Sequence, residues 1–125
     1  TVDSITNKGS QETHVTIQGD NKHEFLKIPI ADLLYLESRG NYVVVSYIKH
    51  PFDVKTFIIR KTLKKLEAQL SEFKIFRCHK SFLVNGSQKL VSLKREGRSF
   101  LLFPEADLTV PVSPGYSKTV LERVL

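Results

Sequence analysis

The sequence contains a single cysteine and neither methionine nor tryptophan among its 125 residues. One cysteine excludes an internal disulfide and fits a reducing compartment, so we expect a cytoplasmic protein. The chain has no run of about 18 apolar residues, which a membrane-spanning helix requires, and no signal-peptide pattern at its start. We therefore expect no membrane partner. Because no methionine opens the chain, we expect a fragment of a longer protein.

Groups for catalysis or metal binding are also scarce. The four histidines lie far apart in the sequence, and a lone cysteine completes no zinc-binding set. The six glycines are scattered, so the sequence has no glycine-rich phosphate loop. Cys78 and His79 are neighbours, but adjacent side chains of an extended segment point to opposite faces and cannot pair for catalysis. We expect no enzyme, no metal and no cofactor, and we interpret Cys78 as a small buried residue.

Positive charge is abundant and unevenly distributed. The net charge is +6, yet residues 1–59 carry six basic and seven acidic side chains, whereas residues 60–125 carry thirteen and six. Such asymmetry in a folded chain favours a surface that meets nucleic acid. One alternative is a merely soluble basic domain, and another is a β-rich interaction or dimerisation module that docks an acidic partner.

Hydrophobic alternation predicts a mainly β domain with many short antiparallel strands. The expected strands cover residues 13–17, 23–28, 33–36 after a tight turn at Asp32, 42–48, 54–59, 76–80, 89–93, 99–103 and 109–112. Within the second of these strands, the pattern directs Phe25 inward, with Leu26 as a further candidate for the inner face. A turn is expected at His50-Pro51. We expect residues 1–22 to be a linker or lead-in with a possible edge strand, and residues 23–125 to form the folded domain.

Two helices complete the expected architecture. The apolar period becomes helical over residues 60–70, where a seam faces the core behind Thr62 as N-cap; the seam consists of Leu63, Leu66 and Leu70. A second helix is expected to start at Ser113-Pro114, because a hydroxyl cap followed by proline is typical of helix starts. The fold therefore has one mid-chain helix and one C-terminal helix.

Duplex recognition needs Lys and Arg for phosphates and fork-shaped or amide donors for base edges. Three polar segments supply such side chains: residues 38–42, 77–80 and 113–118. We expect the segments near residues 40 and 79 to share one cationic side of a rigid β scaffold. The alternatives are that Arg39 and Asn41 are ordinary turn residues, that His79 hydrogen-bonds its own scaffold, and that Ser113 only caps a helix.

Several segments in a fixed order resemble the LytTR family of DNA-binding domains, over roughly residues 23–125. The most distinctive is the run from Phe76 to Asn85, with its Arg-x-His-x-Ser-aromatic-x-Val-Asn core. The other matching segments are Ile30 to Ser38, Gly40-Asn41-Tyr42-Val43, Arg60 to Glu67, and Val110 to Ser113 with Tyr116.

This resemblance implies short antiparallel sheets packed in an elongated stack with minor helices. It also implies sequence-specific binding of double-stranded DNA by the output domain of a bacterial two-component response regulator, behind a receiver domain. Loops rather than a recognition helix would enter successive major grooves of paired direct repeats. Two copies of the domain would occupy each site, which allows a dimer on DNA.

Carried over by residue, the resemblance implies three contact regions. The first comprises Arg39, Asn41 and Tyr42. The second comprises His79 and Lys80, with Arg77 positioning the loop or touching phosphate. The third falls at Ser113 and its successors, but Pro114-Gly115 stands where the family commonly has basic residues. Either Lys118 compensates for this departure or the third contact is weak.

Overall fold

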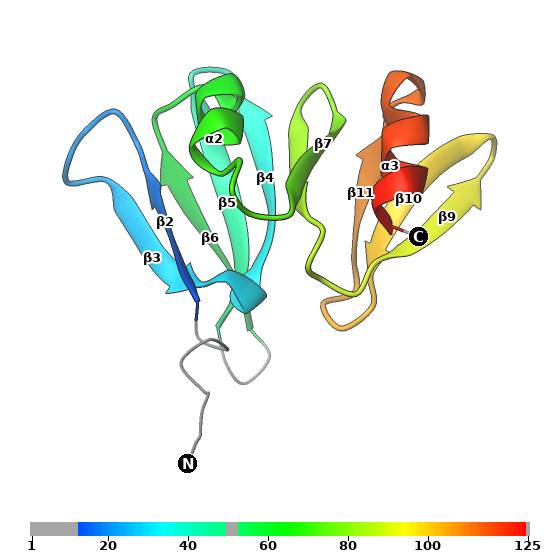
Figure 1. Cartoon of the computed structure of the whole chain (residues 1–125), viewed down its shortest axis with the longest axis horizontal. Helices are drawn as coiled ribbons and strands as arrows, with labels where there is room; N and C mark the ends of the chain where they lie inside the picture. The colour runs from blue at the N-terminus through cyan, green and yellow to red at the C-terminus, as the bar shows by residue number, and fades with distance from the viewer. Residues whose placement is uncertain (1–12, 50–52, 125) are drawn as a thin grey trace, which may run out of the picture.

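Three antiparallel sheets lie side by side along the long axis of the chain in the computed structural model, which describes residues 13–49 and 53–124 (Figure 1). The expected lead-in over residues 1–11 and the turn at His50-Pro51 lie outside the described residues. No helix within the described ranges is long and apolar enough to cross a membrane.

The element order confirms the expected fold class, with short antiparallel strands, one mid-chain helix and one C-terminal helix. The first sheet pairs β2 (His14–Gln18) with β3 (Phe25–Pro29). The central sheet has the order β6 (Asp53–Ile59), β5 (Tyr42–Lys49), β4 (Leu33–Arg39), β8 (Phe82–Asn85) and β7 (Ile75–His79). The third sheet has the order β11 (Leu108–Val112), β10 (Arg98–Phe103) and β9 (Val91–Arg95). The helices are η1 (Ile30–Asp32), α2 (Leu63–Gln69), η2 (Pro114–Tyr116) and α3 (Ser117–Val124).

Strands β4 and β8 of the central sheet are buried on both faces, because successive side chains of a strand point in opposite directions. Leu36 and Leu83 belong to a first core that also contains residues of β2, β3 and α2. Leu34 and Val84, on the same two strands, belong to a second core with residues of β10, β11 and α3. Strands held between two cores give a rigid base for the connections at their ends.

Helix α2 forms where the leucine seam predicts it. The Thr62 hydroxyl accepts a hydrogen bond from the Lys65 N–H at 3.2 Å, so the predicted N-cap is confirmed. A cap of this kind stabilises a helix by about 1 kcal/mol. The seam is buried in the first core, as expected, and consists of Leu63, Leu66 and Leu70.

The β2–β3 hairpin packs on the first core, in which Ile17 is fully buried. The boundary of the folded domain near residue 22 stays a prediction. The inward orientation expected for Phe25 is wrong, since this side chain is 53% exposed. In the observed register Leu26 pairs with Ile17, and Phe25 pairs with the exposed Gln18. Paired residues of an antiparallel ladder share a face, so Phe25 follows Gln18 into solvent.

Candidate nucleic-acid interface

Two turns of the central sheet lie next to each other at one end of the molecule. Because β4 pairs antiparallel with β8, the end of β4 meets the start of β8. The Ser38 N–H donates to the Ser81 carbonyl at 2.8 Å and ties the two connections together. We call residues 39–42 the open turn and residues 79–82 the braced turn. Both lie along the upper edge of Figure 1, so the two segments expected to share one side do share it.

The open turn has few interactions of its own. Gly40 adopts a φ of +62°, which side-chain-bearing residues rarely adopt, and a Cβ placed there would meet no atom within 4 Å. Asn41 and Tyr42 are exposed. The Arg39 guanidinium donates to the Glu37 carboxylate at 3.2 Å, and this hydrogen bond raises the pKa of Arg39. The open turn therefore presents an amide, a phenol and a guanidinium to solvent.

The braced turn is held from below by an arginine. Arg77 Nε and Nη2 donate to one oxygen of the Glu67 carboxylate at 3.2 and 2.8 Å, which connects β7 to α2. Its Nη1 donates to the Lys80 carbonyl at 2.9 Å, inside the turn. The Arg77 side chain is only 18% exposed. Charge-assisted hydrogen bonds of this kind are short and directional, so Arg77 fixes the backbone from which Lys80 projects.

The orientation of His79 follows from its backbone neighbour. The Ser81 N–H donates to Nδ1 of His79 at 3.1 Å, and the ring meets Phe82 edge-on with centroids 5.5 Å apart. Because a backbone N–H can only donate, Nδ1 is the unprotonated nitrogen and Nε2 carries the hydrogen. The expected bond of His79 to its own scaffold thus uses one nitrogen and leaves an N–H donor on the other. Lys80 beside it is exposed.

The third segment reaches the same end through the backbone. The Ser113 N–H donates to the Cys78 carbonyl at 3.0 Å, which brings the start of η2 beside β7. Ser113 occupies the N-cap position, but the hydroxyl bond expected of a helix cap is absent from it. The first turn is closed instead by the Tyr116 N–H, which donates to the Ser113 carbonyl at 2.9 Å. The Ser113 hydroxyl is therefore not used by the helix. Lys118, in the first turn of α3, is exposed.

A hollow of about 560 Å³ lies beside the braced turn. Its polar side chains come from β7, the β9–β10 hairpin and the segment after β11: His79, Lys94, Arg98, Ser99, Ser113 and Ser117. Strand pairing explains why these segments lie together, since Ser99 lies opposite both Lys94 and Val112. Among the described residues that line the hollow, none is acidic.

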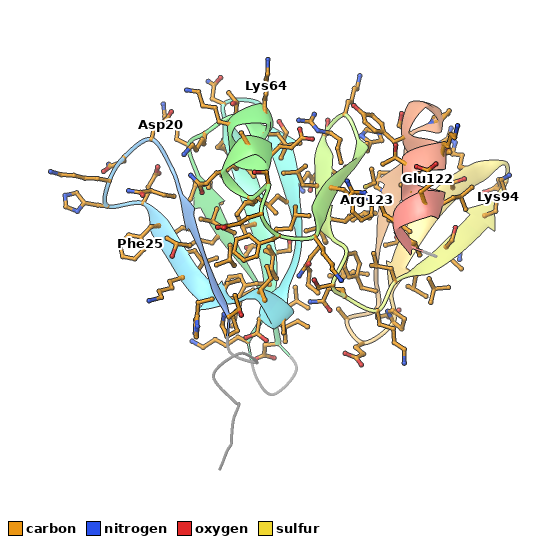
Figure 2. The ribbon with its side chains drawn as sticks, viewed as in Figure 1. Asp20, Phe25, Lys64, Lys94, Glu122 and Arg123 are labelled. Carbon is orange, nitrogen blue, oxygen red and sulfur yellow. The ribbon has the colours of Figure 1, made fainter. Side chains whose placement is uncertain are left out.

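Further basic residues stand at this end on the other side of the open turn. Val43 pairs with Ile59, so β6 also ends here and Arg60 follows it. Figure 2 shows Lys64 projecting from α2 beyond the same edge of the molecule. The connections of the central and third sheets, together with α2, therefore place several basic side chains at this end.

A family model described as the LytTr DNA-binding domain matches residues 23–124. The chain belongs to the LytTr DNA-binding domain family. Its fold is similar to that of a solved LytTr DNA-binding domain from a methyl-accepting/DNA response regulator of Bacillus cereus, with a TM-score of 0.67. The two sequences are 21% identical, and the match covers 90% of this chain and 96% of that one.

Sequence reasoning missed three side chains that build this end of the LytTr domain. Glu67 is one of two acidic residues among the nine charged residues between 60 and 80, and its isolation in a basic segment was the available signal. Lys94 and Arg98 lie at the β9–β10 turn, whose sequence is typical of an ordinary polar loop. Only strand pairing brings these two cations beside His79.

Cys78 of the LytTr domain is buried in the second core, as expected. Its thiol donates to the Pro111 carbonyl at 3.5 Å. Burial removes the thiolate from water and raises the pKa of Cys78 from 9.0 to about 12. A thiol with this pKa is not a nucleophile at neutral pH, so the contribution of Cys78 is packing beneath the braced turn.

Proposed function

We propose that this LytTr domain binds double-stranded DNA at specific sequences and regulates transcription as the output domain of a cytoplasmic two-component response regulator. Family membership supports DNA as the partner. The observation that carries the proposal is the hydrogen bond from Ser38 to Ser81, which couples the open turn to the braced turn at the ends of two strands held between the cores. Adjacent projections from one edge of a sheet are suited to reading neighbouring parts of a duplex.

The two turns are proposed to enter successive major grooves. In the open turn, Asn41 offers an amide that can read adenine, Arg39 offers a fork that can read guanine, and Tyr42 stands beside them. In the braced turn, His79 offers its Nε2–H and Lys80 its ammonium group. We assign Arg77 a positioning role, because its donors are engaged with Glu67 and the Lys80 carbonyl.

The third contact is proposed at the start of α3. Ser113 offers a free hydroxyl and Lys118 an exposed ammonium group, while Pro114-Gly115 offers no cation. We therefore expect this region to contact the phosphate backbone more than base edges. The complete assembly would place two copies of the domain on a direct repeat, as a dimer on DNA, with a receiver domain in the full-length chain.

In vitro selection of bound duplexes from a random pool tests this proposal. We expect enrichment of a motif that occurs twice in the same orientation, at a spacing near one helical turn or a multiple of it. Recovery of a pool without a motif contradicts specific reading. An affinity for the best duplex that does not exceed the affinity for polyglutamate at the same salt would favour an acidic protein partner instead.

A double variant tests the residue assignment on the selected duplex. Each lost base contact costs ~1–3 kcal/mol, so His79→Ala/Lys80→Ala should bind at least roughly 30-fold more weakly in fluorescence anisotropy. The matched control is Lys49→Ala, which removes an exposed cation where Lys49 pairs with Asp53, at the opposite end of the sheet. Unchanged affinity of the double variant, or an equal loss in the control, removes the assignment.

A further inference from the structure

The polar part of the hollow beside the braced turn has the chemistry of an anion site, while the rest of its lining is apolar. It presents two permanent cations, Lys94 and Arg98, and three hydroxyl groups, and no acidic residue among the described residues contributes to its lining. Within the described ranges, neither Lys94 nor Arg98 has a hydrogen bond or an ion pair. Exposed cations with no acceptor of their own are available to an incoming oxyanion.

The polar lining side chains come from three separate segments of the fold. Ser113 approaches from the end of β11, and its hydroxyl makes no cap bond to η2. His79 approaches from β7 and carries a hydrogen on Nε2, because Nδ1 accepts from the Ser81 N–H. Lys94 approaches on the face of the β9–β10 hairpin that it shares with Ser99, and Arg98 borders the hollow next to the turn of that hairpin. Donors from three independent segments therefore face one space.

The size of the hollow decides which oxyanion it fits. At about 560 Å³ it is many times the ~30 Å³ that one water occupies in the liquid, so a free inorganic ion would leave most of it filled with solvent. A phosphodiester with its flanking sugars is larger and continuous with a duplex. The hollow also shares His79 with the braced turn, which places it where a strand bordering that groove would pass.

We infer that this hollow holds a backbone phosphate of the DNA strand that borders the groove entered by the braced turn. Lys94 and Arg98 carry the charge of the contact, and the Ser113 hydroxyl donates to a phosphate oxygen. The inference rests on the proposed DNA binding and extends it to Lys94 and Arg98, which sequence analysis did not predict as contact residues. It also explains how Pro114-Gly115 can replace basic residues, since the β9–β10 hairpin supplies the positive charge from the other side.

The salt dependence of binding tests the inference. Neutralising one phosphate contributes about −0.9 to the slope of log K against log salt. Lys94→Ala/Arg98→Ala should therefore flatten this slope by about one and weaken binding by an equal factor on the selected duplex and on an unrelated one. The motif recovered by in vitro selection should stay the same, because phosphate contacts carry no sequence information.

Arg95→Ala is the matched control. Arg95 is exposed and adjacent to Lys94 in β9, but it does not line the hollow. We expect its slope to match that of the wild type. An unchanged slope in the double variant, or an equal flattening in Arg95→Ala, overturns the inference. All three positions are on the surface, so the variants should fold, and circular dichroism with thermal unfolding checks this.

Two further measurements distinguish failure of the proposed function from failure of the phosphate site alone. If the wild-type domain binds no duplex, the proposed function fails; if it binds and the double variant binds identically, only the phosphate site fails. Inorganic phosphate, titrated into the free domain at constant ionic strength and followed by NMR, should give weak shifts that do not saturate. Saturable shifts that vanish in the double variant would assign the hollow to a free anion and overturn the inference.

Discussion

The open turn and the braced turn end neighbouring strands of the same sheet, yet they are held very differently. The open turn, residues 39–42, relies on a positive-φ glycine and on one ion pair between exposed groups. The braced turn, residues 79–82, has an arginine that joins it to α2, a histidine bonded to its backbone, and a core cysteine beneath it. One sheet therefore supports one projection with few side-chain contacts and one that is braced by several.

This difference matters for binding, because ordering a loop opposes association. Fixing a flexible backbone costs roughly 1–2 kcal/mol per residue in conformational entropy, and a turn already fixed avoids that cost. The braced turn is therefore suited to setting the register of the domain on DNA. The open turn is suited to adjusting to the neighbouring groove once that register is set.

The largest expected effect concerns the thiol beneath the braced turn. Raising the pKa of Cys78 from 9.0 to about 12 lowers its thiolate fraction by ~1,000-fold near neutral pH. A thiol-reactive disulfide should therefore modify Cys78 at least ~1,000-fold more slowly in buffer than in denaturant. Because Cys78 is the single cysteine of the chain, the absorbance of the released thiolate reports on this site alone.

The same pKa shift predicts how stability changes with pH. A folded-state pKa above the unfolded value makes a contribution that is complete below about pH 9 and is lost as the pH rises towards 12. Urea unfolding across this range should show a loss for the wild type that is smaller in Cys78→Ser. In the thiol-modification experiment, a rate for the native protein within about tenfold of the denatured rate would mean that β7 opens readily. The contrast between the two turns would then disappear.

Removing the brace should give the next largest effect. Arg77→Ala loses two hydrogen bonds to Glu67 and one to the Lys80 carbonyl. We expect the free energy of unfolding to fall by about 2 kcal/mol, since hydrogen bonds to charged groups contribute more than neutral ones. Urea denaturation measures the change, and Cys78 should also become more reactive. Glu67→Gln, which keeps an acceptor for Arg77, should cost less; a larger loss in Glu67→Gln would place the stabilisation elsewhere.

Sequence reasoning succeeded where the cause of a structure is local and failed where it is tertiary. The leucine period of α2 and its Thr62 cap depend on neighbours within a few positions, and both were predictable. The outward orientation of Phe25 depends on which strand pairs with β3. The periodicity of one strand alone therefore could not show which of its side chains face the core.

The candidate site divides in the same way. Both turns were predictable from their polar residues, because strand ends collect side chains that need water. The pair of Arg77 with Glu67 was not predictable, since it joins a strand to a helix ten positions earlier in the chain. The hollow was not predictable either, because Lys94 and Ser113 meet only through the pairing of β9, β10 and β11.

A glycine substitution tests whether the open turn depends on backbone conformation alone. Gly40→Ala adds a Cβ that meets no atom within 4 Å, so its cost comes only from the φ of +62°. This conformation costs a side-chain-bearing residue about 1 kcal/mol. Gly40→Asn should cost less, because asparagine tolerates left-handed backbone. Urea denaturation separates the two, and equal stabilities for both variants and the wild type would show that the open turn adopts another conformation in solution.

The smallest effect should come from the ion pair of the open turn. Arg39, like Arg77, pairs with a glutamate, but the Arg39 side chain is 58% exposed where that of Arg77 is 18% exposed. Exposed pairs of this kind contribute little, because water and salt screen them. Arg39→Ala should therefore leave the urea midpoint within error of the wild type while weakening binding to the selected duplex. Because the two variants remove the same side chain from pairs with the same acid, a midpoint shift in Arg39→Ala as large as that in Arg77→Ala would mean that burial does not distinguish the two turns.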